Sequence, residues 1–451
     1  MSIYSRRFAP SLPYVALVTV MALAIGACAG SDGPELVAVT SAPTPTPLAG
    51  SAETPTPIGP ATPTPAPTPT AEPTPTPVPV LTRGISNDTV GIAIVKTASV
   101  FGDVEVGVSA RIERTNTAGG VGGRSVEIVD VLNDRGDPDR LLRQVQRLVN
   151  NSEVFAVVLA TAVPTPEVTD LLAESSMPFF GWGFAPGFCL PNEWGFGFNG
   201  CLIGTVLGIP GAAPDTSPRE LVDALADEPE QITVVVSDDP SGAAARATAE
   251  EIWGDRLTSV IVDDAAGGDA TVDSTVDAVV ASAGEVAMIS VGLDRAIALK
   301  AALRGPFDGL VVDDVSYLPG LLSDFAVADA LEGGYAHSQF PPQEEYREVT
   351  GVMATDLEAI GADLIYSQAV SLGYWSSDLM LALMESVGPD LNTSTFHQKV
   401  NVDGVRYDPE PDGAPCPMDS VDIHRSAAGG GALVAVTGGI YFPAVAFTCF
   451  G

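Results

Sequence analysis

The chain has 451 residues, enough for two or three domains, and carries 57 acidic against 21 basic side chains, a formal net charge of −36. Such an excess of negative charge repels phosphate backbones, so nucleic-acid binding is not expected. Hydrophobic residues make up 46 % of the sequence, which excludes a wholly disordered acidic protein.

The first thirty residues have the features of an export signal. Arg6 and Arg7 precede an apolar run from Val15 to Ala27, which is shorter than the roughly 20 residues that span a membrane. The run ends in Ile25-Gly26-Ala27-Cys28, which resembles the lipobox of bacterial lipoproteins, where the cysteine is lipidated after cleavage. We therefore expect residues 1–28 to be a lipoprotein signal, with Cys28 anchored on the extracytoplasmic side of the cell membrane. The alternative is an ordinary signal peptide with a chance cysteine.

Residues 29–83 are rich in proline and threonine, with alternating runs at Pro43–Pro47 and from Pro63 to Pro79. Proline fixes φ and lacks a backbone donor, so this stretch builds neither helix nor sheet. We expect an extended polyproline-II tether with a reach on the order of 170 Å, at about 3.1 Å per residue.

From residue 84 onward, apolar strand patterns alternate with helical patterns. Asp137-Pro138 is typical of a helix start, with a capping carboxylate followed by proline at the first helical position. The strands expected first are Val90–Val95, Val126–Leu132, Val154–Leu159 and Met177–Phe180, and the helices are Val104–Asn116, Asp139–Asn150 and Glu167–Ser175. Gly195–Gly200 matches a dinucleotide-binding fingerprint by letter but lacks its strand and helix context, so it is expected to be a loop.

The pattern then restarts. Strands are expected at Ile232–Val236, Ser259–Val262, Val286–Val291 and Leu310–Val312, and helices at Gly242–Trp253, Val272–Ala283 and Arg295–Leu303. So many alternating units predict an α/β fold of two doubly wound, Rossmann-like lobes with a hinge and a ligand cleft between them. The expected division is 84–204 for the first lobe, 205–304 for the second, 305–400 for a return to the first, and 401–451 for a C-terminal segment on the second.

Several motifs in this order and spacing resemble the type I periplasmic solute-binding proteins of the branched-chain amino-acid-binding family. The resemblance extends from about Asn87 to Gly388 and is carried by Phe101-Gly102-Asp103, Asn116–Arg124, Asn133–Pro138, Phe155–Val158, Ser237–Gly242 and Gly373–Asp378. It implies capture of a small polar solute outside the cell, delivery to an ABC permease in the membrane, and a monomer that needs no cofactor. A ligand-sensing receptor ectodomain of the same fold, or a surface protein that has lost binding, are the alternatives.

The resemblance also assigns ligand contacts. Phe101 falls where the family places an aromatic ring on the ligand, and Asp294 where a carboxylate meets the substrate ammonium. Ala162 and Ala185 stand where the family offers hydroxyls to a carboxylate, and Ser241 stands where it has a tyrosine. These departures weaken the case for an amino-acid ligand and leave another polar solute open.

Neighbouring residues extend this candidate set. Thr161 and Thr165 are adjacent hydroxyls that would substitute for the missing ones, and Trp182, Gly183 and Phe184 follow the fourth expected strand. Tyr335 represents a group, with His337 and Phe340, of which one member is expected to face the cleft. Each also has a structural alternative: Asp294 as a helix cap, Phe101 as packing, and the Trp182 and Phe184 rings as filling between lobes.

Four cysteines remain after Cys28, an even number that suits disulfides in an exported protein. They allow three pairings, of which sequence proximity favours Cys189–Cys201 and Cys416–Cys449. The three histidines are scattered, so no metal site is expected. No nucleophile elbow or zinc-protease motif is present either, so an enzyme is the disfavoured class.

Overall fold

The computed structural model describes most of the chain after residue 82. The described ranges are 83–205, 207–213, 215–238, 240–263, 269–318, 320–339, 341–342, 344, 351–362, 367–409 and 415–450. The expected export signal, Cys28 and the tether up to residue 82 lie outside these ranges. Among the described residues, no helix combines the length and the apolar character needed to cross a membrane.

The first lobe is built on a five-stranded sheet in the order β2-β1-β3-β4-β5, with every neighbouring pair parallel. Its strands are β1 (Thr89–Lys96), β2 (Ser125–Asn133), β3 (Ala156–Ala160), β4 (Phe179–Gly181) and β5 (Gly195–Gly197). Four of them confirm the sequence prediction. The fifth corrects it, because Gly195–Gly200 was expected to be a loop. Phe196 of β5 is fully buried and stacks on Phe180 at 5.1 Å, so the alternation of Gly and Phe is that of a short edge strand.

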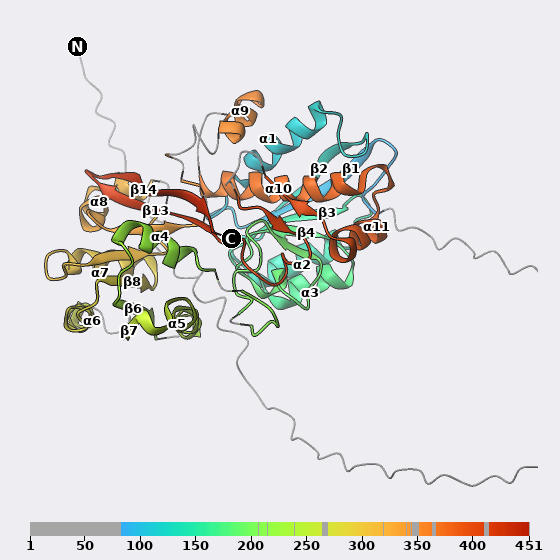
Figure 1. Cartoon of the computed structure of the whole chain (residues 1–451). Coiled ribbons are helices and arrows are strands. Elements are labelled where there is room, and N and C mark those ends of the chain that lie inside the picture. Colours follow the sequence, from blue (N-terminus) through green and yellow to red (C-terminus); the bar gives the residue numbers. More distant parts are fainter. Residues whose placement is uncertain are drawn as a thin grey trace, which may run out of the picture. The chain divides into compact units, whose positions relative to one another are not determined.

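Helices cover both faces of this sheet (Figure 1). One face packs against α1 (Val104–Thr117) and α10 (Gln368–Val387), whose buried residues share one apolar cluster with β1 and β3. The other face packs against α2 (Pro138–Leu148) and α3 (Pro166–Glu174). The helix start predicted at Asp137 is confirmed, since its side chain accepts a hydrogen bond from Arg140 N at 3.0 Å. Two shorter helices, α9 (Gly351–Ala359) and α11 (Thr393–His397), complete this part.

The second lobe contains a seven-stranded sheet in the order β14-β13-β10-β9-β8-β6-β7. Its strands are β6 (Ile232–Ser237), β7 (Leu257–Asp263), β8 (Val286–Ser290), β9 (Leu310–Asp313), β10 (Tyr335–Ser338), β13 (Gly430–Thr437) and β14 (Ile440–Cys449). The flanking helices are α4 (Ser217–Ala226), α5 (Pro240–Trp253), α6 (Asp269–Ala281), α7 (Leu293–Leu303) and α8 (Phe325–Leu331). Two α/β lobes of mostly parallel strands confirm the predicted fold class.

The expected division of the chain needs one correction. Residues 305–400 were expected to return to the first lobe, but β9 and β10 hydrogen-bond within the second sheet, so the return comes after β10. Residues 401–451 contribute to both lobes. Tyr407, in β11 (Arg406–Tyr407), belongs to the first apolar cluster, together with Met418 of β12 (Met418–Asp419), whereas β13 pairs antiparallel with β10.

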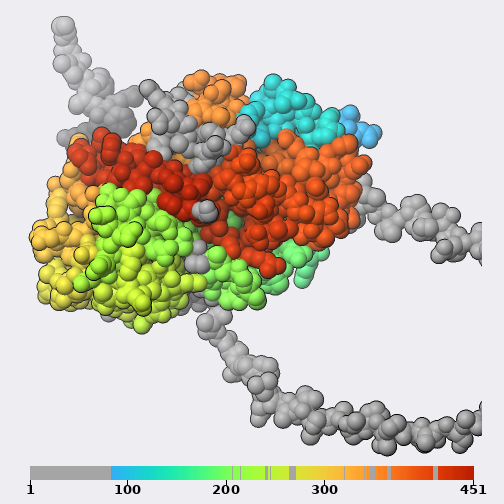
Figure 2. All heavy atoms as spheres, viewed as in Figure 1, coloured from blue at the N-terminus to red at the C-terminus, as the bar shows by residue number. Residues whose placement is uncertain are grey.

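Two segments that connect the lobes run side by side. Gly200 and Ala427 form an antiparallel bridge, Cys201 N donates to Ser426 O at 3.0 Å, and Ala428 N donates to Asn199 O at 2.8 Å. A Cβ on Gly200 would lie 2.2 Å from Ser426 O, so this close approach requires glycine. In Figure 2 the red surface of the C-terminal residues borders both the green surface after residue 215 and the orange surface of α10.

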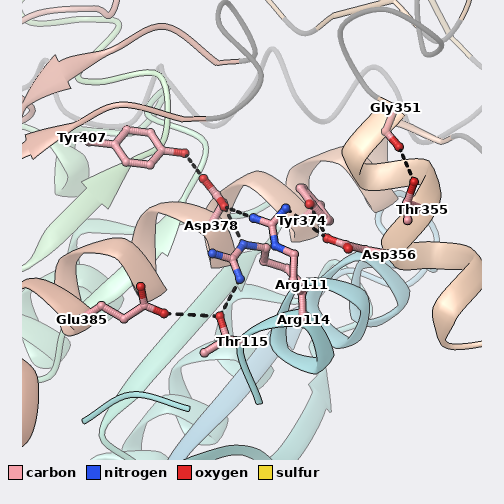
Figure 3. A network of polar contacts seen from close by, with 10 residues as sticks. All are labelled: Arg111, Arg114, Thr115, Gly351, Thr355, Asp356, Tyr374, Asp378, Glu385 and Tyr407. Carbon is pink, nitrogen blue, oxygen red and sulfur yellow. Dashed lines mark hydrogen bonds and ion pairs between the residues drawn. The ribbon is translucent and has the colours of Figure 1, made fainter. Parts of the chain in front are cut away.

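A buried ionic network fastens the helices of the first lobe (Figure 3). Arg111 Nε of α1 donates to Asp378 Oδ1 of α10 at 2.5 Å, and Tyr407 OH donates to Asp378 Oδ2 at 2.7 Å. Tyr374 OH donates to Asp356 Oδ2 of α9 at 2.6 Å. The Arg111 and Asp378 side chains keep only 9 % and 8 % of their exposure, so the ion pair is enclosed and links the return segment to the lobe.

Candidate binding site between the lobes

The carboxyl ends of the parallel strands are where an α/β sheet places its binding loops. In the first lobe, Thr97, Thr161 and Trp182 directly follow β1, β3 and β4. In the second lobe, Asp314 directly follows β9 and Gln339 follows β10. The contacts of these residues determine which of them are available to a ligand.

On the first lobe, the loops after β1, β2 and β3 meet at a fully buried carboxylate, Asp134. Its Oδ1 accepts from Thr97 Oγ1 at 2.7 Å, and its Oδ2 accepts from Thr161 Oγ1 at 2.6 Å. Ala162 N in turn donates to Thr97 Oγ1 at 3.0 Å. The Thr161 hydroxyl and the Ala162 amide, both expected to meet the ligand, are therefore engaged in holding the loops together.

The loop after β4 points toward the second lobe. Trp182 is half-buried, and its Nε1 donates to Gln339 Oε1 at 3.0 Å, which is a direct hydrogen bond between residues of the two lobes. The Trp182 ring contacts Phe184 edge-on at 5.4 Å. Gly183 N donates to Asn199 Oδ1 at 3.0 Å, which ties this loop to the loop after β5. This contact places Trp182 where the two lobes meet, and its expected contact with a ligand stays a prediction.

Three other expected contact residues lie inside apolar clusters. Phe101 is 1 % exposed and packs with β1 and α1, and Ala185 is 4 % exposed beneath α3. Tyr335 opens β10 and packs in the interior of the second lobe. For Phe101 the structure favours the packing alternative. Tyr335 needs a correction, because the residues that reach the carboxyl edge of β10 are His337 to Gln339.

On the second lobe, a buried ion pair shapes the turn after β9. Lys300 Nζ of α7 pairs with the carboxylate of Asp313, and neither side chain is more than 2 % exposed. Asp313 Oδ1 also accepts from Val315 N and Ser316 N at 2.7 and 2.6 Å. This arrangement fixes the backbone of the turn and directs the next residue, Asp314, outward, so that its side chain keeps 45 % of its exposure.

Asp314 lies among polar groups from neighbouring strands. Ser290 Oγ, at the end of β8, donates to its Oδ2 at 3.0 Å, and His337 Nδ1 lies 3.9 Å from its Oδ1. Removal from water raises the pKa of Asp314, and the carboxylates of Asp313 and Asp215 act in the same direction. His337 and Ser290 act against this rise. Asp314 is therefore an accessible carboxylate at the carboxyl edge of the second sheet, with polar groups from neighbouring strands around it.

A chain of polar contacts joins Asp314 to Trp182. Gln339 Nε2 donates to Asp215 Oδ2 at 3.4 Å, and Asp215 Oδ1 accepts from Ser217 N at 3.0 Å. Ser217 Oγ lies 3.4 Å from His337 Nε2, and the other ring nitrogen of His337, Nδ1, faces Asp314. The structure therefore brings Trp182 of the first lobe and the carboxyl edge of the second lobe into one polar constellation.

Two further expected residues lie on the second lobe. Asp294 is exposed in the first turn of α7, two residues after the N-cap position Gly292, so it is not the capping residue. Ser241 lies in the first turn of α5. No recorded contact among the described residues joins the Asp294 side chain to the Trp182 constellation.

Four residues of this constellation are not among those predicted from the sequence: Asp314, Gln339, Asp215 and Ser290. Asp314 and Gln339 each come directly after an apolar strand, and that position was the signal that could have identified them. Asp215 could not be found in this way, because it precedes α4 and comes near Gln339 only through the fold.

Other features of the structure lie away from this constellation. One surface depression of about 520 Å³ is lined by residues before β8 and β9, at the opposite edge of the second sheet. Another, of about 660 Å³, covers α2. The described residues contain no group of three or more His, Cys, Asp or Glu arranged to hold a metal ion. The disulfides Cys189–Cys201 and Cys416–Cys449 confirm the favoured pairing.

Comparisons with known proteins agree with this architecture. The family profile described as periplasmic binding protein matches residues 96–417. A putative branched-chain amino acid ABC transporter from Rhodospirillum rubrum is 17 % identical, covers 79 % of this chain and 99 % of its own, and superposes with a TM-score of 0.57. An ABC transporter substrate-binding protein from Aeropyrum pernix is 11 % identical over 81 % and 97 % of the two chains, with a TM-score of 0.62.

A third similar structure is a solute-binding protein from R. palustris in complex with 4-hydroxybenzoate. It is 15 % identical over 80 % of this chain and 97 % of its own, with a TM-score of 0.58. At such identities the structures establish the fold alone, and no curated protein matches the chain. The family profile, by contrast, extends over more than half of the chain and agrees with the resemblance seen in the sequence. The chain therefore belongs to the periplasmic binding protein family, of the type I branched-chain amino-acid-binding kind.

Proposed function

We propose that this protein is a lipid-anchored, extracytoplasmic solute-binding protein that captures a small polar solute between its lobes and delivers it to an ABC importer. The family is one of extracytoplasmic substrate-binding proteins, not of enzymes, and its members serve ABC importers by binding a small molecule and a membrane permease. The lipobox at Cys28 supports the anchor, and the proline-rich segment supports a tether that lets the folded part reach a permease.

The observation that carries the binding proposal is the hydrogen bond between Trp182 Nε1 and Gln339 Oε1. It joins the loop after β4 to the loop after β10, so the carboxyl edges of the two sheets meet at this point. A solute held there would touch both lobes and stabilise their closed arrangement, as in hinged two-lobe binding proteins. No covalent chemistry is required of the site, only complementary donors, acceptors and an aromatic surface.

A thermal-shift screen of the purified protein tests binding. A solute that binds only the folded state raises the free energy of unfolding by about 2.7 kcal/mol at a hundredfold excess over Kd, and so raises the unfolding midpoint. We expect a hit among amino acids, amides, amines and aromatic acids. Trp182→Phe, which removes the indole donor, should weaken the hit, whereas Trp194→Phe, which alters a ring that stacks on His397, should not. The absence of any hit, or equal loss in both variants, would contradict the proposed site.

Uptake of the labelled hit by cells with and without the gene tests delivery. Loss of uptake in the deletion strain supports an importer component. Unchanged uptake together with retained binding in vitro would instead assign the protein to ligand sensing.

A further inference from the structure

The described residues of the second lobe place several exposed carboxylates at its carboxyl edge. Exposed carboxylates follow three adjacent strands: Asp238 after β6, Asp294 after β8 and Asp314 after β9. Side by side on neighbouring strands, they place their charges along the same edge of the sheet.

The cations near these edges are already paired with other carboxylates. Arg295 donates to both oxygens of buried Asp263, each at 2.7 Å. Lys300 pairs with Asp313 inside the second lobe, and Lys96, at the end of β1, pairs with Glu105. Among the described loop residues that follow the strands of the two sheets, Arg135 is the exposed cation that remains. It follows β2, which β1 and β3 separate from β4 and Trp182.

Histidine does not restore neutrality at the constellation. His337 faces Asp314 through one ring nitrogen and Ser217 through the other. Asp215, which accepts a hydrogen bond from Gln339, is a second carboxylate of the constellation. The charges of the two carboxylates therefore exceed the single positive charge that a protonated imidazole would carry. Bringing an anionic ligand to this place would add repulsion at short range, while a cation would relieve it.

The donors that a ligand carboxylate would need are engaged elsewhere. Ala162 N donates to Thr97 Oγ1, the Thr161 hydroxyl donates to Asp134, and Gly183 N donates to Asn199 Oδ1. A carboxylate that replaced these partners would leave buried acceptors unsatisfied. The engagement of these three donors is independent of the charge on the second lobe and leads to the same conclusion.

Resting on the proposed function, we infer that the solute held between the lobes is a small organic cation without a free carboxylate, such as an amine, amidine or quaternary ammonium compound. Asp314 meets the positive group from the second lobe, and the Trp182 ring covers it from the first. A cation over an indole face adds attraction because the ring carries negative charge density on its face. The inference separates this chain from similar proteins whose ligands are carboxylates, such as the one in complex with 4-hydroxybenzoate.

A panel of similar solutes that differ in charge tests the inference on the purified full-length protein. The cations are benzylamine, 1,4-diaminobutane and choline, and the counterparts are phenylalanine, benzamide and benzoate. Thermal shift identifies hits, and calorimetric titration gives their affinities. We expect at least one cation to bind, with at least tenfold higher affinity than any zwitterion, neutral compound or anion in the panel.

The carboxylates at the two ends of β9 supply a matched pair of variants. Asp314→Asn, at the carboxyl end, should weaken the cation at least tenfold, while Asp308→Asn, an exposed carboxylate just before the strand, should leave its affinity unchanged. Equal unfolding midpoints would show that both variants fold. Preferential binding of benzoate or phenylalanine with dependence on Trp182 would overturn the inference and leave the proposed function standing. No shift from any compound would count against both.

Discussion

Two polar clusters of this protein are built from similar side chains and differ in enclosure and charge balance. The Arg111–Asp378 cluster of the first lobe has arginines opposite its carboxylates, and its Arg111–Asp378 pair is shut away from water. The constellation around Asp314 reaches the first lobe through the Gln339–Trp182 hydrogen bond, is open to solvent at Asp314, and carries more acids than bases. The enclosed, paired charges of the Arg111–Asp378 cluster can only hold helices together. The constellation around Asp314, by contrast, has an accessible carboxylate that a ligand can reach.

The largest loss of stability is expected when one partner is removed from the Arg111–Asp378 cluster. Asp378→Ala leaves the guanidinium of Arg111 buried without its partner and removes the acceptor of Tyr407. Breaking a buried ion pair on one side costs about 3–5 kcal/mol. Chemical denaturation of wild type and variant measures this loss.

A surface ion pair provides the control for that experiment. Asp419 lies 3.4 Å from Arg406, and both side chains are more than half exposed. Asp419→Ala should lower the free energy of unfolding by less than about 1 kcal/mol. If Asp378→Ala destabilised the protein no more than Asp419→Ala, the buried pair would not have the structural role assigned to it.

A smaller effect, with a characteristic pH dependence, is expected at Tyr407. Burial, with the adjacent Asp378 carboxylate, raises the pKa of Tyr407 well above its usual value of 10.0. In the unfolded chain the phenol ionises near pH 10, whereas in the folded protein it stays protonated. Ionisation of the phenol therefore stabilises only the unfolded state, and the free energy of unfolding falls as the pH rises above about 10.

Tyr407→Phe should accordingly cost about 1.5–3 kcal/mol at neutral pH, the usual contribution of a hydrogen bond to a charged group. It should also make the loss of stability above pH 10 less steep. Tyr317→Phe, at a solvent-exposed hydrogen bond to Glu344, is the control and should show neither change. Parallel alkaline stability curves for wild type and Tyr407→Phe would contradict the enclosed position of this phenol.

The smallest effect on stability, and of opposite sign, is expected in the open constellation. The raised pKa of Asp314 means that its charged form is disfavoured by folding. Asp314→Asn should therefore raise stability at neutral pH, by less than about 1 kcal/mol because the side chain is partly exposed. The gain should vanish in acid, where the wild-type carboxyl is protonated in both states. A loss of stability comparable to that of Asp378→Ala would show that Asp314 supports the fold and is not reserved for a ligand.

The fold could be predicted from the sequence where burial alone decides the structure. The Val90–Val95 run became β1, and Asp137-Pro138 began α2, because both patterns act within a few residues. β5 escaped prediction because Gly195 is required by the close approach of Gly187 and Phe179, which local sequence does not reveal. The late return to the first lobe likewise depends on the pairing of β10 with β13, more than ninety residues apart in sequence.

The candidate site was less predictable for a related reason. The position carried over from the family named Ala162, and the neighbouring Thr161 was expected to substitute for its missing hydroxyl, but the Ala162 amide and the Thr161 hydroxyl are engaged by Thr97 and Asp134 in this chain. Trp182 was found because an aromatic residue directly after a strand is conspicuous. Asp314 also directly follows a strand but was missed, because which of the adjacent acids Asp313 and Asp314 faces outward depends on Lys300 pairing with Asp313 inside the lobe.

Hydrogen–deuterium exchange of the purified protein, with and without saturating benzylamine, tests the central claim most directly. We predict slower exchange in two separate segments, the loop at residues 182–185 of the first lobe and the turn at residues 314–317 of the second, because a cation held between the lobes contacts both. Protection confined to one lobe, or slower exchange only around the depression over α2, would contradict a binding site between the lobes.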